Sequence, residues 1–104
     1  MITAVFYKQS GNLTGFKVSG HAGYADAGSD IVCASVTSSV QLACNLITEY
    51  FGIEAEVTAQ DNTVALKVRE TSDITNKIIT GLYDHIDLIS QQFKKTINLK
   101  FSEV

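Results

Sequence analysis

The sequence contains no proline, only two cysteines and only two histidines. Without proline no segment is typical of a stiff linker, and two cysteines are too few for a disulfide framework. No run of about 18 apolar residues occurs, so we expect no membrane span. The N-terminus has no basic stretch before an apolar core, which argues against a signal peptide. These absences predict one soluble, cytoplasmic domain over residues 1–104.

Basic residues are also scarce, with eight Lys and Arg against eleven Asp and Glu and a net charge of −3 at pH 7. Binding to phosphates needs clustered Lys and Arg. The small cluster of Lys94, Lys95 and Lys100 is better explained as a solvated surface, so we expect no direct contact with nucleic acid. The chain is 45% hydrophobic and 18% charged, which suffices for a core without metals or disulfides.

Alternating apolar and polar residues predict two β-hairpins. The first comprises residues 2–8 and 13–19. The second comprises residues 54–60 and 63–70, which flank the turn residues Asp61 and Asn62. Asn98 to Phe101 predict a final short strand.

Two further segments have the period of amphipathic helices. The first begins after an N-cap at Ser29 or Asp30 and stops near Gly52; its apolar stripe is Val32, Val36, Val40, Ala43 and Ile47, widened by Leu46, Tyr50 and Phe51. The second begins at Ser72 or Asp73, and its apolar stripe is Ile74, Ile78, Leu82, Ile86 and Ile89, with Ile79, Tyr83 and Phe93 beside it. The order ββαββαβ predicts an α+β domain, with two helices packed on a mixed or antiparallel sheet of about five strands.

The stretch GHAGYADAGSDIVCASVT, from Gly20 to Thr37, is the candidate for chemistry. With Asp30 as N-cap, Cys33 would occupy the first helical turn, where unpaired N–H groups and the helix dipole stabilise a thiolate and an oxyanion. His21 precedes it across a loop of small residues and could accept the thiol proton. Asp26 or Asp30 could orient His21.

Residue types alone leave the ordinary interpretation open, because most cysteines are buried and inert and most loop histidines lie on the surface. Cys44 lies in the apolar stripe and is interpreted as a core residue. His85 is expected on the surface or at an interface. Zinc and C-x-x-C redox motifs are disfavoured, because their ligand spacings are missing.

The same stretch resembles the signature of the ribosomal-processing cysteine proteases, the Prp or YsxB-like family. That signature is a Gly-His pair, a loop of small residues, and an Asp-Ile-Val-Cys-Ala helix start. The resemblance extends to the length and the ββαββαβ layout of the whole chain. It implies a homodimeric enzyme, without metal or cofactor, that removes a short N-terminal extension from a large-subunit ribosomal protein (number twenty-seven).

The resemblance also implies roles for individual residues. Cys33 would be the nucleophile and His21 the general base, and Asp30 matches the acidic position before the cysteine. Thr37 falls where many relatives carry serine, and its hydroxyl makes it a supporting residue. A mobile loop that closes over peptide would contain three glycines, Gly20, Gly23 and Gly28.

Two other functions remain to be weighed against the protease. A non-catalytic, ribosome-associated binding module would need no reactive thiol. A thiol redox sensor would need a resolving cysteine, and Cys44 lies eleven residues after Cys33 on the same predicted helix, too far to bridge. The second helix is apolar near Ile78 and Tyr83 on more than one face, which suits either a subunit contact or a two-sided core.

Overall fold

The computed structural model describes residues 1–20 and 27–104, and of residues 27–30 it describes the backbone only. The elements are β1 (Ile2–Gln9), β2 (Asn12–Gly20), α1 (Ala27–Asn45), the π-helical turn η1 (Leu46–Tyr50), β3 (Ala55–Gln60), β4 (Thr63–Val68), α2 (Asp73–Gln92) and β5 (Ile97–Glu103). The predicted α+β class and ββαββαβ order are confirmed.

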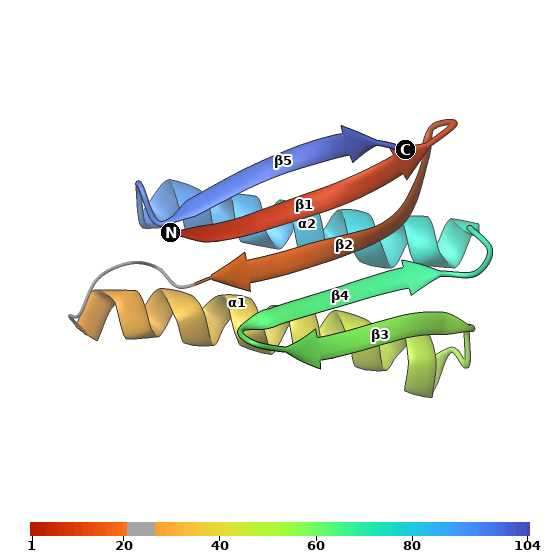
Figure 1. The fold of residues 1–104 in the computed structure, drawn as a ribbon, viewed down its shortest axis with the longest axis horizontal. Coiled ribbons are helices and arrows are strands. Elements are labelled where there is room, and N and C mark those ends of the chain that lie inside the picture. The colour runs from red at the N-terminus through yellow and green to blue at the C-terminus, as the bar shows by residue number, and fades with distance from the viewer. Residues whose placement is uncertain (21–26) are drawn as a thin grey trace.

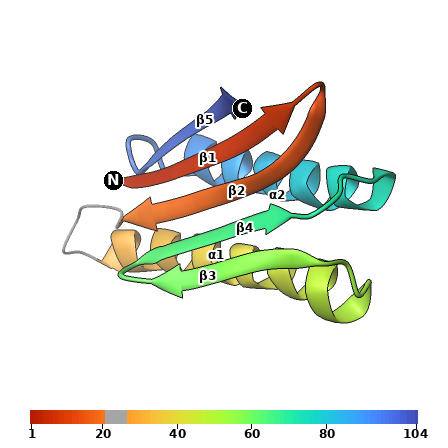
Figure 2. The same cartoon turned by 45° about the vertical axis from the view of Figure 1, so that its right-hand side comes forward.

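The five strands form one mixed sheet in the order β3-β4-β2-β1-β5. Strand β1 pairs antiparallel with β2 and parallel with β5, while β4 pairs antiparallel with both β2 and β3. Both helices cover the same face of this sheet (Figure 1). The view in Figure 2 shows that α1 lies behind β3 and β4, and that α2 lies behind the other half of the sheet. One hydrophobic core therefore fills the space between the sheet and the two helices.

Helix α1 buries the stripe that its period predicts. The buried members are Val32, Val36, Val40 and Ala43 in α1 and Ile47 in the η1 turn that follows. Tyr50 and Phe51, expected to widen this stripe, are 78% and 52% exposed, so that expectation is wrong. The reason is η1, in which the Phe51 N–H donates to the Leu46 oxygen five residues earlier at 2.9 Å. The wider turn shifts later side chains off a 3.6-residue stripe.

Helix α2 begins as predicted but buries a different face in its first turns. Ser72 is the N-cap, and its Oγ accepts the Thr75 N–H at 3.1 Å. In return, Thr75 Oγ1 accepts the Ser72 N–H at 2.9 Å. This capping box turns Thr75 inward, so that Thr75 and Ile79 are buried while Ile74 is 42% exposed. The predicted apolar stripe is therefore wrong at Ile74, whereas Ile78 is partly buried and packs against the core.

The helical segment Ile31–Tyr50 is long and apolar enough to cross a membrane by length and composition, with a mean hydropathy of 1.5. The prediction that no such segment exists considered only uninterrupted apolar runs. A helix that covers a hydrophobic core passes the same test. The buried stripe of α1 packs in the core that it shares with the sheet.

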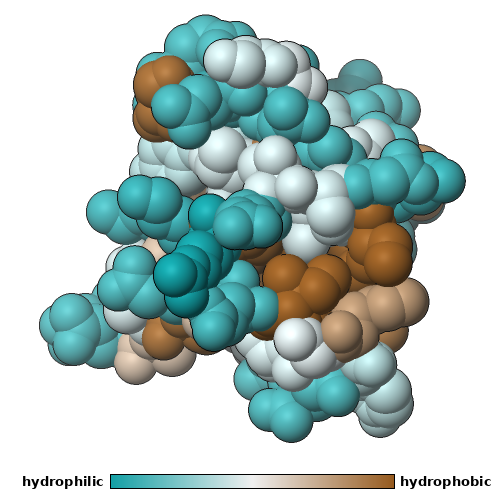
Figure 3. Space-filling model, turned by 90° about the vertical axis from the view of Figure 1, so that its right-hand side faces the viewer, coloured by the Kyte–Doolittle hydropathy of each residue, from teal (hydrophilic) through white to brown (hydrophobic). Residues whose placement is uncertain are grey.

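The end of the molecule where α1 finishes and α2 begins exposes apolar side chains. Figure 3 shows hydrophobic side chains gathered among polar ones on this end. The exposed side chains of Phe51 and Ile74 belong to the segments that meet here. At the opposite end, β2 finishes and α1 begins (Figure 1).

Candidate active site

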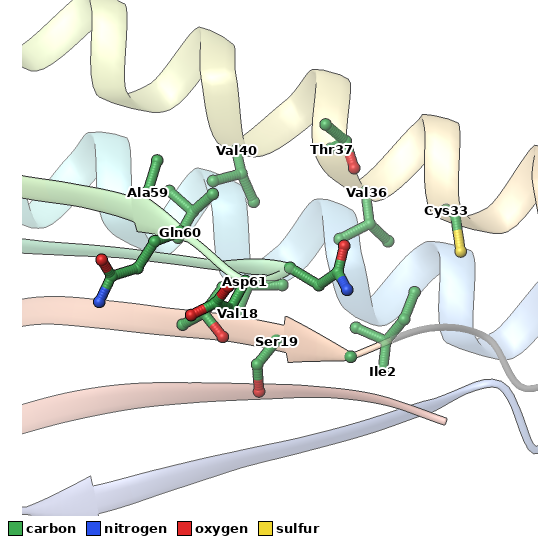
Figure 4. Close-up of a pocket in the computed structure, with 14 residues that line it drawn as sticks. Ile2, Val18, Ser19, Cys33, Val36, Thr37, Val40, Ala59, Gln60 and Asp61 are labelled. Atoms are coloured by element: carbon green, nitrogen blue, oxygen red, sulfur yellow. The ribbon is translucent and has the colours of Figure 1, made fainter.

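A cavity of about 410 Å³ lies between α1 and the turn end of the β3–β4 hairpin. Its helical wall consists of Cys33, Val36, Thr37 and Val40, which succeed one another along α1. The strands contribute a second apolar wall that includes Val18, Ala59 and Val64. Figure 4 shows Cys33 at one end of the helical wall and Val40 at the other. The cavity thus combines apolar walls with one thiol.

Cys33 is half-buried and packs against the hydrophobic core. Helix α1 begins at Ala27, so Cys33 is its seventh residue. The expected helix start at Ser29 or Asp30 is wrong, and Cys33 lies in the second turn. Only the first four N–H groups of a helix lack a partner within it. The unpaired N–H groups therefore belong to the turn before Cys33, and the prediction that Cys33 lies among them is wrong.

The other predicted site residues are only partly described. His21 and Gly23 lie outside the described residues. The backbone of Asp30 belongs to the first turn of α1. Thr37 is exposed and follows Cys33 by one turn, so the two residues line the same cavity at successive places along α1 (Figure 4).

Two glycines expected in a mobile loop belong to regular elements instead. Gly20 is the last residue of β2, and Gly28 lies inside α1. Gly20 has a φ of 91°, and a Cβ there would lie 2.7 Å from the carbonyl oxygen of Met1. Only glycine fits this left-handed position beside the N-terminus. Gly20 therefore shapes the strand end from which the chain continues to His21.

The turn between β3 and β4 forms one rim of the cavity. Its residues Asp61 and Asn62 have φ angles of 51° and 61°, as a type I′ turn requires. The Asn62 carbonyl oxygen accepts a hydrogen bond from the Gly20 N–H at 3.1 Å. This bond positions the residue that directly precedes His21. Sequence reasoning used Asp61 and Asn62 only as turn residues and missed their place at the site, because no local signal reports the pairing of β2 with β4.

The second cysteine lies in a different environment. Cys44 is buried with 8% exposure among the apolar residues of the core. Burial raises the pKa of the Cys44 thiol, because an apolar surrounding disfavours the thiolate. Its interpretation as a core residue is confirmed. Within the described part of the chain, no group of three or more His, Cys, Asp or Glu side chains could hold a metal ion.

The sequence profile of the family described as cysteine protease Prp matches residues 1–98. The chain belongs to this family. The predicted resemblance is therefore confirmed over nearly the whole chain. No curated protein matches the sequence.

Solved structures share the fold at low sequence identity. The essential ribosomal processing protease Prp from S. aureus, in complex with a covalently linked product peptide, matches with a TM-score of 0.88 and 22% identity, covering 98% of this chain and 100% of that one. The same protease with a substrate peptide matches with 0.88 and 21%, over the same shares. SMU.848 from Streptococcus mutans matches with 0.82 and 19%, covering 100% of this chain and 96% of its own.

Proposed function

We propose that this protein is a cysteine endopeptidase that removes the N-terminal extension of a large-subunit ribosomal protein (number twenty-seven) during ribosome maturation. The match of the cysteine protease family to residues 1–98 carries the proposal. The position of Cys33 on the wall of an apolar cavity supports it. The S. aureus protease of the same fold is described with substrate and product peptides, which supports a peptide as the ligand here.

The chemistry uses the Cys33 thiolate as nucleophile and His21 as acid and base. The thiolate attacks the scissile carbonyl carbon and forms a C–S bond. The C–N bond then breaks while the His21 imidazolium donates its proton to the leaving amine. Neutral His21 next accepts a proton from water, which attacks the thioester and releases the acyl product as a carboxylic acid. The thiolate and imidazolium are thereby restored, and no metal or cofactor takes part.

Two further residues assist this pair in the proposal. Asp30 lies near the start of α1 and orients His21 through its carboxylate. Thr37 follows Cys33 by one helical turn and lines the same cavity. Its hydroxyl has a supporting role there in binding the peptide.

The assembly and location are part of the same proposal. The enzyme acts in the cytoplasm as a homodimer; the homodimer is what the resemblance of GHAGYADAGSDIVCASVT to the family signature implies. Light scattering on the purified chain should give twice the mass of one chain. A monomer that retains full activity would contradict the dimer and leave the proteolytic chemistry in place.

Direct digestion of the substrate tests the proposed activity. The full chain is incubated with the precursor of ribosomal protein number twenty-seven from the same organism, and new N-termini are mapped by mass spectrometry. We expect a single cut that releases a short N-terminal peptide. Cys33→Ala serves as the inactive control. A precursor that stays intact with the wild-type chain, or is cut equally by Cys33→Ala, would contradict the proposal.

A further inference from the structure

The face of the sheet that the helices leave open is basic, unlike the chain as a whole. Both helices lie on one side of the sheet (Figure 1), and successive strand residues alternate between its two faces. Among the strand residues that alternate onto the open face, the charged ones are Lys17, Lys67, Lys100 and Glu56. Their neighbours along the strands, such as Phe16 and Leu66, are buried under the helices. Three lysines therefore accompany one glutamate on this face, in a chain whose net charge is −3.

The fold groups these lysines in a way that the order of the sequence does not show. The prediction of no contact with nucleic acid considered the total charge and the cluster of Lys94, Lys95 and Lys100. Lys100 lies on β5, whereas Lys94 and Lys95 lie in the segment between α2 and β5. Lys100 instead shares a row across the sheet with Lys17, because both pair with Val5 of β1. The open face therefore favours an anionic partner.

A hollow of about 690 Å³ lies on this open face, and we call it the sheet hollow. Tyr7 of β1 and Lys67 of β4 line it, and each of them pairs with Gly15 of β2. Because glycine has no side chain, none separates Tyr7 from Lys67. A Cβ at Gly15 would lie 2.1 Å from the carbonyl oxygen of Leu66, so only glycine fits between them.

Strand geometry gives the dimensions of the sheet hollow. Tyr7 and Lys67 lie two strand spacings apart, about 10 Å, and Lys17 lies about 7 Å from Gly15 along β2. Ala65, which pairs with Lys17, contributes only a methyl group to the lining. One aromatic ring and two ammonium groups therefore border a space whose volume suits a small organic ligand or one unit of a polymer.

The remaining charges of the sheet hollow leave Lys17 as its most available cation. Arg69 also lines the hollow, but its guanidinium donates to the Glu54 carboxylate at 2.6 Å. Glu56 pairs directly with Lys67 across β3 and β4. Lys17 pairs with Ala65 and Val5, so no opposite charge lies directly across from it on either neighbouring strand.

We propose that the sheet hollow binds single-stranded RNA, with a base stacked on Tyr7 and backbone phosphates on Lys17 and Lys67. An open sheet face with aromatic and basic side chains is a known platform for single strands, because every base has a face that can stack. The row from Lys17 to Lys100 extends the positive charge to the edge strand β5. A strand of several nucleotides therefore gains a third phosphate contact, which a free mononucleotide does not reach.

This site is separate from the candidate active site. No described residue lines both the sheet hollow and the cavity beside Cys33. RNA and a peptide substrate therefore bind without competing. The inference goes beyond the proposed proteolysis and does not depend on it, so an uncut precursor would leave the RNA site standing.

Fluorescence polarisation of labelled octauridylate with the full chain tests the binding. We expect a dissociation constant of about 10 µM at about 50 mM salt. Three phosphate contacts on a single strand predict a slope of about −2 for the logarithm of affinity against the logarithm of salt concentration. Affinity should thus fall about 20-fold at about 200 mM salt. Absence of binding at low salt, or a slope near zero, would overturn the inference.

A matched pair of lysine variants assigns the phosphate contact. Lys17→Gln should weaken binding about 5-fold at low salt and reduce the steepness of the salt slope by about 0.7, because one phosphate contact is lost. Lys94→Gln removes the same charge outside the sheet and should keep the affinity within about twofold and the slope unchanged. Equal effects of the two variants would overturn the site.

A pair of tyrosine variants tests the stacking. Tyr7→Ala should weaken binding about 10-fold while the salt slope stays the same, because a stacked base is lost and no phosphate contact is. Tyr7→Phe keeps the ring and should bind like the wild type, which controls for folding. Tyr50 is 78% exposed outside the sheet, so Tyr50→Ala should change the affinity less than twofold. Equal losses in Tyr7→Ala and Tyr50→Ala would contradict the stacking.

Two competitors separate the proposed ligand from others of similar chemistry. Uridine monophosphate supplies one base and one phosphate, and octaglutamate supplies negative charge without a base. Each should displace octauridylate at least 10-fold more weakly than unlabelled octauridylate does. A monophosphate as effective as the octamer would overturn the RNA strand in favour of a free nucleotide. An equally effective octaglutamate would overturn it in favour of an acidic peptide.

Discussion

The two cysteines of α1 lie on one helix yet differ in burial and in surroundings. Cys33 is half-buried on the wall of a cavity, whereas Cys44 is buried in the core. Burial raises the pKa of the Cys44 thiol, which keeps it protonated and weakly nucleophilic at neutral pH. The presence of a cysteine therefore indicates little about function by itself. The surroundings of each cysteine determine how reactive its thiol is.

The difference follows from what faces each end of α1. Beside Cys33, α1 faces the turn end of the β3–β4 hairpin, and space remains between them. Beside Cys44, the core contains Ala43 and Ile47, and the Thr48 hydroxyl donates to the Cys44 carbonyl oxygen at 2.9 Å. The Cys33 end of α1 therefore borders a cavity, whereas the Cys44 end packs in the core.

Replacing each cysteine with alanine should give the largest difference between the two sites, measured as the rate of precursor cleavage. Cys33→Ala is expected to lower the rate of precursor cleavage by about 1,000-fold or more, because the nucleophile is lost. Cys44→Ala should keep the rate within about threefold, since the core residue touches no substrate. The rate is measured by mass spectrometry, with circular dichroism as the control for folding. Equal losses of cleavage rate in the two variants would contradict the assignment of Cys33 as nucleophile and Cys44 as a core residue.

Alkylation should rank the thiols in the same order without a substrate. In the native protein at neutral pH, iodoacetamide should modify Cys33 about 100-fold faster than Cys44, because burial shields the Cys44 sulfur and raises its pKa. In 8 M urea, which unfolds the chain and exposes both thiols, the two rates should converge. Peptide mapping gives both rates in one sample. Cys44 reacting as fast as Cys33 in the native state would show that this end of α1 opens readily.

Two isoleucines extend the comparison to stability: Ile31 lies in α1, and Ile47 lies in η1, the π-helical turn that follows α1. Ile47 is fully buried and Ile31 is 54% exposed. Ile47→Ala should lower the free energy of unfolding by about 3 kcal/mol, through lost burial and a new cavity. Ile31→Ala should change it by about 0.5 kcal/mol or less. Urea unfolding measures both, and similar losses would mean that Ile31 packs as tightly as Ile47.

Local patterns were enough to predict much of the fold. Alternation and turn residues located both hairpins, and the period of Val32, Val36 and Val40 identified the buried face of α1. These features depend on neighbours within one or two turns of chain. The motif around Cys33 also predicted the family, since it combines several residue types at fixed spacing.

Three features of the structure were not predicted from the sequence. Ser29 and Asp30 are typical capping residues, yet α1 begins earlier, at Ala27. The capping box at Ser72 turned Thr75 rather than Ile74 into the core. The approach of Asn62 to Gly20 requires β4 to pair with β2, a contact between segments more than forty residues apart. Such pairing is a property of the whole sheet.

Removing the proposed base should produce the smallest change and would sharpen the contrast between the thiols. His21→Ala is expected to slow the alkylation of Cys33 at neutral pH by about 10-fold, because an imidazolium partner stabilises the thiolate. Cys44 provides the internal control: its rate should stay the same, since its environment is set by burial in the core. An unchanged Cys33 rate would exclude an ion pair with His21 in the free enzyme. A rate lowered equally at both cysteines would instead indicate a general change in the fold. Only a rate lowered at Cys33 alone would support an interaction between His21 and the Cys33 thiolate.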